Sequence, residues 1–228
     1  METNKKGFTL IELLVVIAII AILAAILFPI FISVKEHTKV TGCISNLNQL
    51  GRAMRIYSDD WNGCLPSSYH ASDPKLNWSG TLTRRYCNPR VGQLWRYVKN
   101  MGVYACPSDN NVPAKTFEGT LEQQKKYALS YAMNTLLSYC NLDTLQRPGS
   151  TKTVHNTRLT KMCLLIHEGR ENIGNGDFHP WGSRESVTGI HYDGTCILFA
   201  DMHGRWYSKN ELLRALDNGE WDPSSIVR

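Results

Sequence analysis

The sequence predicts an α+β protein in which one long N-terminal helix packs on a small antiparallel sheet. Three observations support this class: a charge-free apolar run near the N-terminus, an apolar stripe at helical spacing after it, and short strand-like runs toward the C-terminus. The 228 residues, 43% of them hydrophobic, leave room for one packed domain beside the apolar run.

The charge-free run, Leu13–Ile32, has the length of a membrane-spanning helix. At 1.5 Å per residue, such a helix covers roughly 30 Å, the thickness of the hydrocarbon core of a bilayer. The run is too long for the apolar region of a secretory signal peptide, and its alanines lie inside it instead of after it. A plain signal anchor explains the length and the preceding lysines, but it does not explain Glu12, an ionisable side chain that is costly in a membrane helix.

The predicted helix continues beyond the membrane. Apolar residues recur every three or four positions after the run, which places them on one helical face. Turn formers over residues 59–63 end the pattern. We therefore predict one helix over residues 8–58, membrane-spanning over 10–32 and amphipathic over 33–58, packed on a head formed by residues 59–228. The residues of the stripe are Val40, Ile44, Leu47, Gly51, Met54 and Tyr57.

The head is predicted to combine loops, short strands and two helices. Residues 59–91 are rich in turn formers and are predicted to form a long loop, followed by a short helix over residues 92–100. Ser208 and Glu211 have the spacing of a capping box, which predicts a closing helix that ends near Gly219. Strands are predicted at residues 102–106, 127–133, 161–167, 195–201 and 205–207, the last two as a hairpin.

The octet Lys5-Lys6-Gly7-Phe8-Thr9-Leu10-Ile11-Glu12 resembles the N-terminus of type IV prepilins and type II secretion pseudopilins. The resemblance implies that prepilin peptidase removes a leader, residues 1–7, by cutting after Gly7, and that the new N-terminal Phe8 is methylated. It also implies that Glu12 guides filament assembly, where its carboxylate can neutralise the amine of Phe8 in a neighbouring subunit. Pro29 removes a helix hydrogen bond. In the family, a proline at the matching position marks where the helix stretches in the filament; the alternative is a proline that a membrane helix merely tolerates.

The same resemblance implies a location and a set of partners. The chain is expected to be a single-pass inner-membrane protein with its N-terminus in the cytoplasm and its head in the periplasm or outside the cell. Expected partners are prepilin peptidase, copies of the chain, other pilins or pseudopilins in a filament, and an inner-membrane assembly platform. The net charge of +5 comes without a dense Lys/Arg run, which argues against nucleic acid as a partner. We expect a structural subunit of a type IV pilus-like filament or a type II secretion pseudopilus, and not an enzyme.

Other segments resemble a pilin-like group that carries a C-terminal His-x9-Asp-Gly signature. The signature falls at His191 and Asp201, but Met202 stands where the group has glycine. The tight turn that glycine allows is therefore not assured here, although Gly204 can supply it two residues later. The group is similar to the major pseudopilin in fold. The resembling segments are residues 43–51, 57–66, 103–109, 130–134 and 191–201.

The signature also has a chemical interpretation. Two histidines and one carboxylate can bind a first-row metal, so His191, Asp201 and His203 suggest an alternative: a membrane-tethered metal-binding or metal-dependent hydrolytic head. His167-Glu168 and His179 are further candidate ligands. Because no HExxH or second motif completes such a site, we prefer a structural role in which His191 and Asp201 hydrogen-bond each other or the backbone and hold the hairpin.

Other candidate ligands are sparse or scattered. Asp177 lies in a turn-rich loop and is one candidate calcium ligand, but calcium sites combine several oxygens, so no cofactor is otherwise expected. The seven cysteines lie in the part of the chain expected beyond the inner membrane, where up to three disulfides can form, with a pairing that the sequence does not give. No two have the CxxC spacing of a zinc knuckle. Cys163 and Cys196 lie in apolar strand-like runs and can instead be buried thiols.

Overall fold

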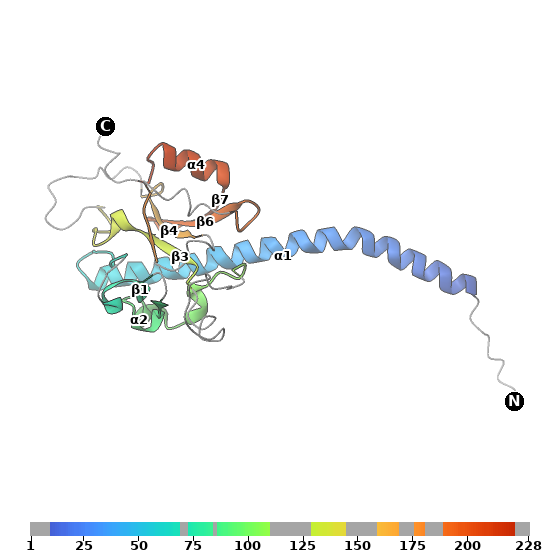
Figure 1. The fold of residues 1–228 in the computed structure, drawn as a ribbon, viewed down its shortest axis with the longest axis horizontal. Coiled ribbons are helices and arrows are strands. Elements are labelled where there is room, and N and C mark those ends of the chain that lie inside the picture. The colour runs from blue at the N-terminus through green and yellow to red at the C-terminus, as the bar shows by residue number, and fades with distance from the viewer. Residues whose placement is uncertain are drawn as a thin grey trace, which may run out of the picture. The chain divides into compact units, whose positions relative to one another are not determined.

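The computed structural model describes residues 10–68, 73–83, 86–109, 129–144, 159–168, 176–180 and 189–221. The chain divides into two compact units, Met1–Thr38 and Lys39–Arg228. Helix α1, Leu10–Asp60, has residues in both units (Figure 1). It confirms the long predicted helix and ends two residues beyond the expected position. Gly7 and Phe8 lie outside the described residues.

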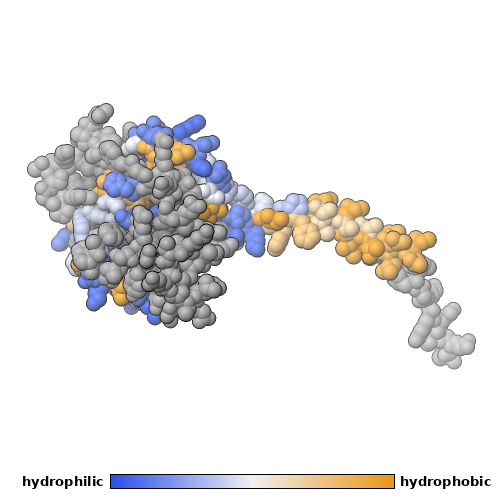
Figure 2. All heavy atoms as spheres, in the orientation of Figure 1, coloured by the Kyte–Doolittle hydropathy of each residue, from blue (hydrophilic) through white to orange (hydrophobic). Residues whose placement is uncertain are grey.

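In the first unit, α1 presents apolar side chains on every side. Its large hydrophobic residues between Leu10 and Val34 are between 45% and 77% exposed, and Figure 2 shows them gathered along this part of the helix. By length and composition, α1 is a candidate membrane span. The helix is unbroken through Pro29.

In the second unit, the same helix is amphipathic and contributes to the core. The expected stripe is confirmed at Leu47, Gly51, Met54 and Tyr57, which are buried. Val40 and Ile44 are partly buried against the same core. The structure adds Cys43 and Leu50 to the buried face, since both are fully inaccessible to solvent.

A five-stranded sheet packs on this face of α1. The strand order is β5-β3-β4-β6-β7. The pairing is antiparallel except between β3 and β5, which are parallel, so the antiparallel sheet expected from sequence is in fact mixed. The α+β class is confirmed. The strands are β3 (Tyr131–Asn134), β4 (Cys163–His167), β5 (Asp177–Phe178), β6 (Gly194–Phe199) and β7 (Gly204–Ser208).

The two faces of the sheet carry separate cores. On β6, Cys196 and Leu198 belong to the core shared with α1, whereas Ile197 and Phe199 belong to a second core with helix α4, Lys209–Asp217. This alternation follows the two-residue period of a strand. In Figure 1, α1 and α4 accordingly lie on opposite sides of β4 and β6.

The hairpin of β6 and β7 approaches α1 closely at Gly51. A Cβ atom at this position would lie 2.8 Å from Cδ2 of Leu198 and 3.1 Å from Sδ of Met202. Real Cβ atoms essentially never come that close to another heavy atom. The absence of a side chain at Gly51 therefore sets how near the helix lies to the hairpin.

The hairpin and the closing helix were predicted correctly, with one difference at the turn. Met202 itself takes the left-handed conformation, with φ of 71°, and Gly204 does not. The turn that glycine makes in the resembled group is therefore made here by a residue with a side chain, at a cost of about 1–2 kcal/mol. The capping box of Ser208 and Glu211 is present at the start of α4.

Two expectations about short elements were wrong, and a third was correct in type but too long. Residues 102–106 form no strand: the segment is a 3₁₀ helix, Met101–Tyr104, whose first turn is capped by the side chain of Asn100. The predicted loop over residues 59–91 contains a two-stranded sheet, β1 (Thr81–Thr83) and β2 (Tyr86–Cys87), and two 3₁₀ turns, Pro74–Leu76 and Pro89–Val91. The helix expected over residues 92–100 is reduced to α2, Trp95–Val98, because Lys99 turns left-handed and ends it. Elements of two to four residues are too short for a hydrophobic period to reveal.

Candidate functional site

Two regions carry the residues of functional interest, the first part of α1 and the core between α1 and the sheet. In the first, Glu12 lies in the first turn of α1, and its side chain is exposed among apolar neighbours. A carboxylate at this end of a helix is favoured by the helix dipole. The cleavage site at Gly7 and Phe8 lies outside the described residues and stays a prediction.

The structure places the two signature residues in different settings. Asp201 is exposed, and its carboxylate accepts a hydrogen bond from the backbone N–H of His203 and pairs with the imidazole of that residue. The His203 ring stacks on Phe199 at 4.5 Å between centroids. Asp201 thus stabilises the turn of the hairpin together with His203.

His191, in contrast, is fully buried at the start of the hairpin. Its backbone carbonyl accepts a hydrogen bond from the indole N–H of Trp206 at 2.8 Å, and its backbone N–H donates to Gly194. These bonds attach the residue to β6 and β7. The imidazole extends away from Asp201's turn, toward Cys106 and Ser108.

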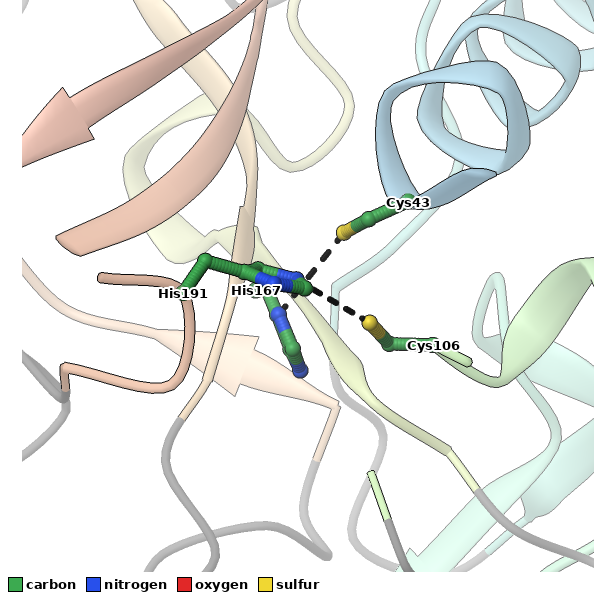
Figure 3. Close-up of side chains that lie close together, drawn as sticks. All are labelled: Cys43, Cys106, His167 and His191. Atoms are coloured by element: carbon green, nitrogen blue, oxygen red, sulfur yellow. Dashed lines mark hydrogen bonds between the residues drawn. The ribbon is translucent and has the colours of Figure 1, made fainter. Parts of the chain in front are cut away.

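The His191 ring belongs to a buried group of four side chains, which we term the cysteine–histidine cluster: Cys43, Cys106, His167 and His191 (Figure 3). One sulfur or ring nitrogen from each residue lies within 4.8 Å of the other three. All four residues are 3% exposed or less. Within the described ranges, this is the one group of three or more Cys, His, Asp and Glu residues with the proximity that a metal ion requires.

Four separate elements bring these residues together. Cys43 comes from the buried face of α1, and Cys106 follows the 3₁₀ helix Met101–Tyr104. His167 is the last residue of β4 and pairs across the sheet with Tyr131 of β3. Residues directly opposite in an antiparallel pair share a face. His167 therefore lies on the α1 side, as Tyr131 does.

Each sulfur lies against one imidazole. Cys43 Sγ is 3.7 Å from His167 Nδ1, and Cys106 Sγ is 3.2 Å from His191 Nε2. The two rings are 5.3 Å apart between centroids. These contacts join residues 124 and 85 positions apart in the chain.

Hydrogen bonds from neighbouring side chains hold the cluster in place. Ser108 Oγ lies 3.2 Å from Nδ1 of His191, on the opposite side of the ring from Cys106. The Tyr131 hydroxyl donates to Cys43 Sγ at 3.6 Å. The backbone N–H of Cys106 donates to Ser130 Oγ at 2.8 Å.

Both thiols are hard to ionise in this environment. Burial raises the pKa of the Cys43 thiol well above its ordinary value. For Cys106, the hydrogen bond with Cys43 and then burial raise the pKa, while the two imidazoles act in the opposite direction. Such thiols are poor nucleophiles, because the thiolate is the reactive form. As buried, un-ionised thiols, the two cysteines are suited to packing or to holding a ligand.

The other candidate ligands lie elsewhere. His179 and His203 are exposed, and Asp177 begins the short strand β5. Glu168 is buried beside His167, where its backbone N–H donates to Ser130. None of these four residues belongs to the cluster.

Sequence reasoning missed Cys43 and Cys106 as partners of the histidines. The lack of a CxxC pair excludes only a local metal motif, and these four ligands come from four elements. The sequence nevertheless contained one indication that these residues belong together. Cys43, Cys106 and His191 each lie in a segment that resembles the His-x9-Asp-Gly group. Cys163 and Cys196 are free, buried thiols, as expected.

Known proteins are similar to this chain in its N-terminal motif and over about a quarter to a third of its length. The prokaryotic N-terminal methylation motif matches residues 3–28. The type IV wide pilus major component PilA4 of Thermus thermophilus is 48% identical over 59 residues, 26% of this chain and 45% of that protein. The type IV major fimbrial protein FimA of Dichelobacter nodosus is 33% identical over 81 residues, 36% of this chain and 47% of that protein.

A secretion protein is also similar. The type II secretion system core protein G of Pseudomonas aeruginosa is 38% identical over 65 residues, 28% of this chain and 45% of that protein. The chain thus spans about half the length of the curated relatives it matches. No solved structure matches it significantly. By its N-terminal motif and these relatives, the chain is a prepilin-like or pseudopilin-like protein.

Proposed function

We propose that this chain is a structural subunit of a type IV pilus-like filament or a type II secretion pseudopilus. The observation that carries the proposal is the first part of α1, where an exposed, wholly apolar surface is interrupted by one carboxylate in the first turn. A helix that is apolar on all sides is stable only in lipid or when packed against other apolar surfaces. Similarity to pilins and to a secretion core protein supports packing against the apolar helices of like subunits, in addition to lipid.

Cleavage of the leader would create a positive charge that can pair with the carboxylate of Glu12. Cutting after Gly7 by prepilin peptidase exposes the amine of Phe8, a cation that becomes methylated. An ionisable side chain at the centre of a membrane helix costs about 2.5–3.5 kcal/mol on insertion scales. In a filament, the Glu12 carboxylate of one subunit would pair with the Phe8 amine of the next, and each charge would reduce the cost of burying the other. This pairing would favour the alignment of subunits in which the two groups meet.

The proposal also assigns an orientation and partners. Lys5 and Lys6 would remain in the cytoplasm, in keeping with the positive-inside rule, and the head would lie across the inner membrane. The subunit would be delivered to an assembly platform in that membrane and would contact copies of itself or other pilins. A hydrolytic head is not favoured, because the cysteine–histidine cluster is closed to solvent, whereas catalytic metal sites keep an open position.

Replacing Glu12 tests the proposal. We expect Glu12→Ala to insert into the membrane at least as well as the wild type, since it removes a charge, and to reduce the chain in the sheared filament fraction about tenfold or more, the effect of losing about 1.4 kcal/mol per contact. Carbonate-resistant membrane association measures insertion, and immunoblotting of sheared filaments from an over-producing strain measures assembly.

Glu36→Ala is the matched control, because Glu36 is an acid on the same helix beyond the charge-free run. This variant should assemble normally. Wild-type levels of filaments from Glu12→Ala, with Phe8 processed, would contradict the proposed role of the carboxylate.

A further inference from the structure

We propose that the cysteine–histidine cluster is a zinc site: Cys43, Cys106, His167 and His191 bind one Zn²⁺ that fastens α1 to the sheet of the head. The inference is independent of the filament role, since it rests only on residues of the second unit, Lys39–Arg228. It concerns a structural metal and not a catalytic one.

The donor atoms match the preference of zinc. Zinc in structural sites is four-coordinate and tetrahedral, and two cysteines with two histidines are among its common ligand sets. Two soft sulfurs and two imidazoles favour zinc over magnesium or calcium, which select oxygen.

The distances are close to those of a loaded site. With bonds of about 2.3 Å to sulfur and about 2.0–2.1 Å to nitrogen, tetrahedral angles place a sulfur about 3.6 Å from a nitrogen. The two measured sulfur–nitrogen distances are 3.7 Å and 3.2 Å. The widest pair of donor atoms is within 4.8 Å, so side-chain adjustments of about 1 Å would bring every pair into the range of a tetrahedral site.

The surroundings favour a divalent cation with two thiolates. Two thiolates and one Zn²⁺ sum to zero charge, which suits a site where all four residues are at most 3% exposed. Zinc coordination deprotonates a thiol outright and so overcomes the effect of burial on Cys43 and Cys106.

The orientation of the histidines gives a second, independent indication. Metal-bound histidines usually donate their other ring N–H to a neighbouring group. Nδ1 of His191 lies 3.2 Å from Ser108 Oγ, which leaves Nε2 directed at Cys106 and available to the metal. His167 is fully buried, and in the described part of the chain its Nε2 has no hydrogen-bond partner. Its Nδ1 faces Cys43 and is the nitrogen available to the metal in this orientation of the ring.

A disulfide between Cys43 and Cys106 is the competing outcome. It would use both sulfurs in an oxidising compartment. It would not account for the two imidazoles, one of which lies against each of these sulfurs. We therefore favour zinc, and the experiment below includes a measurement that would detect the disulfide.

The experiment uses the full chain, extracted in detergent and purified through a tag without histidine from cells grown with zinc. We expect one zinc per chain by mass spectrometry of the metal. X-ray absorption at the zinc edge should show about two sulfurs near 2.3 Å and about two nitrogens near 2.0–2.1 Å. This measurement needs no variant and is therefore independent of whether a mutant folds.

Variants then locate the metal. Cys106→Ala should reduce bound zinc at least tenfold. Cys163→Ala is the matched control, because Cys163 is equally buried but belongs to the core on the other side of the sheet; it should retain one zinc per chain.

Three results would overturn the proposal: a folded chain that stays metal-free after incubation with zinc, a coordination shell made of oxygen, or equal zinc content in the two variants. A fourth would replace it. If membranes alkylated without reductant yield a cross-linked peptide containing Cys43 and Cys106, lighter by two hydrogens than the reduced pair, the cluster is a disulfide.

Discussion

Replacing Asn134 by alanine should destabilise the head strongly, because this side chain joins three parts of the fold. Asn134 is the last residue of β3 and is fully buried. Its amide donates to the carbonyl of Cys163 at 3.0 Å and to that of Trp221 at 3.1 Å. Its oxygen accepts from the backbone N–H of Leu136 at 3.0 Å and caps the 3₁₀ helix Thr135–Leu137.

The magnitude follows from these three bonds. At about 1 kcal/mol for each hydrogen bond, Asn134→Ala should lower the free energy of unfolding by about 3 kcal/mol. The carbonyls of Cys163 and Trp221 would be left without this donor inside the core, which makes a smaller loss hard to reconcile with the geometry. For a domain of this size, the midpoint of thermal unfolding should fall by about 6–12 °C.

Thermal unfolding of the full chain in detergent, followed by near-ultraviolet circular dichroism, measures the effect. The matched control is Asn100→Ala, because Asn100 is exposed and caps a 3₁₀ helix through the single bond to the N–H of Gly102. Its loss should be about 1 kcal/mol or less. Equal losses in the two variants would show that the buried bonds from Asn134 to Cys163 of β4 and to Trp221, four residues after α4, do not have this effect.

Two further predictions concern the packing of α1. Burial, followed by repulsion from Tyr97, Tyr139 and Cys64, raises the pKa of Tyr57 to about 12. The folded state therefore keeps the full stabilisation from the neutral phenol below about pH 10 and loses it as pH rises through about 12. The free energy of unfolding should fall by about 2 kcal/mol over this range. Tyr57→Phe, which cannot ionise, should show no such fall. Gly51→Leu should cost about 1–3 kcal/mol by overpacking against Leu198. The control Arg52→Leu, at an exposed neighbouring position, should change stability by less than about 0.5 kcal/mol. Similar denaturation midpoints for the two variants would contradict the close approach of helix and hairpin.

The long elements could be predicted because their patterns are local. A charge-free run and a stripe at helical spacing define α1, and buried apolar runs define β4 and β6. The Ser208–Glu211 pair marks the start of α4 by itself, since a capping box is a contact between residues three apart.

The cysteine–histidine cluster could not be predicted because it is not local. Cys43 and His167 are 124 residues apart, and their approach depends on how α1 lies on the sheet. The position of β5 has the same origin: its two residues join the sheet by parallel pairing with β3, which no short-range pattern indicates. The sequence analysis paired His191 with Asp201, whereas the imidazole of His191 lies against Cys106 and Ser108. The spacing of a signature does not say which side of the hairpin each residue faces.

The proposed filament role requires that prepilin peptidase first remove the leader of the chain. The most direct test is the intact mass and N-terminal residue of the chain extracted from membranes in which prepilin peptidase is active. We predict a chain that lacks residues 1–7 and begins with methylated Phe8. A chain that still carries residues 1–7 under those conditions would rule out the proposed processing and leave α1 as an ordinary membrane anchor.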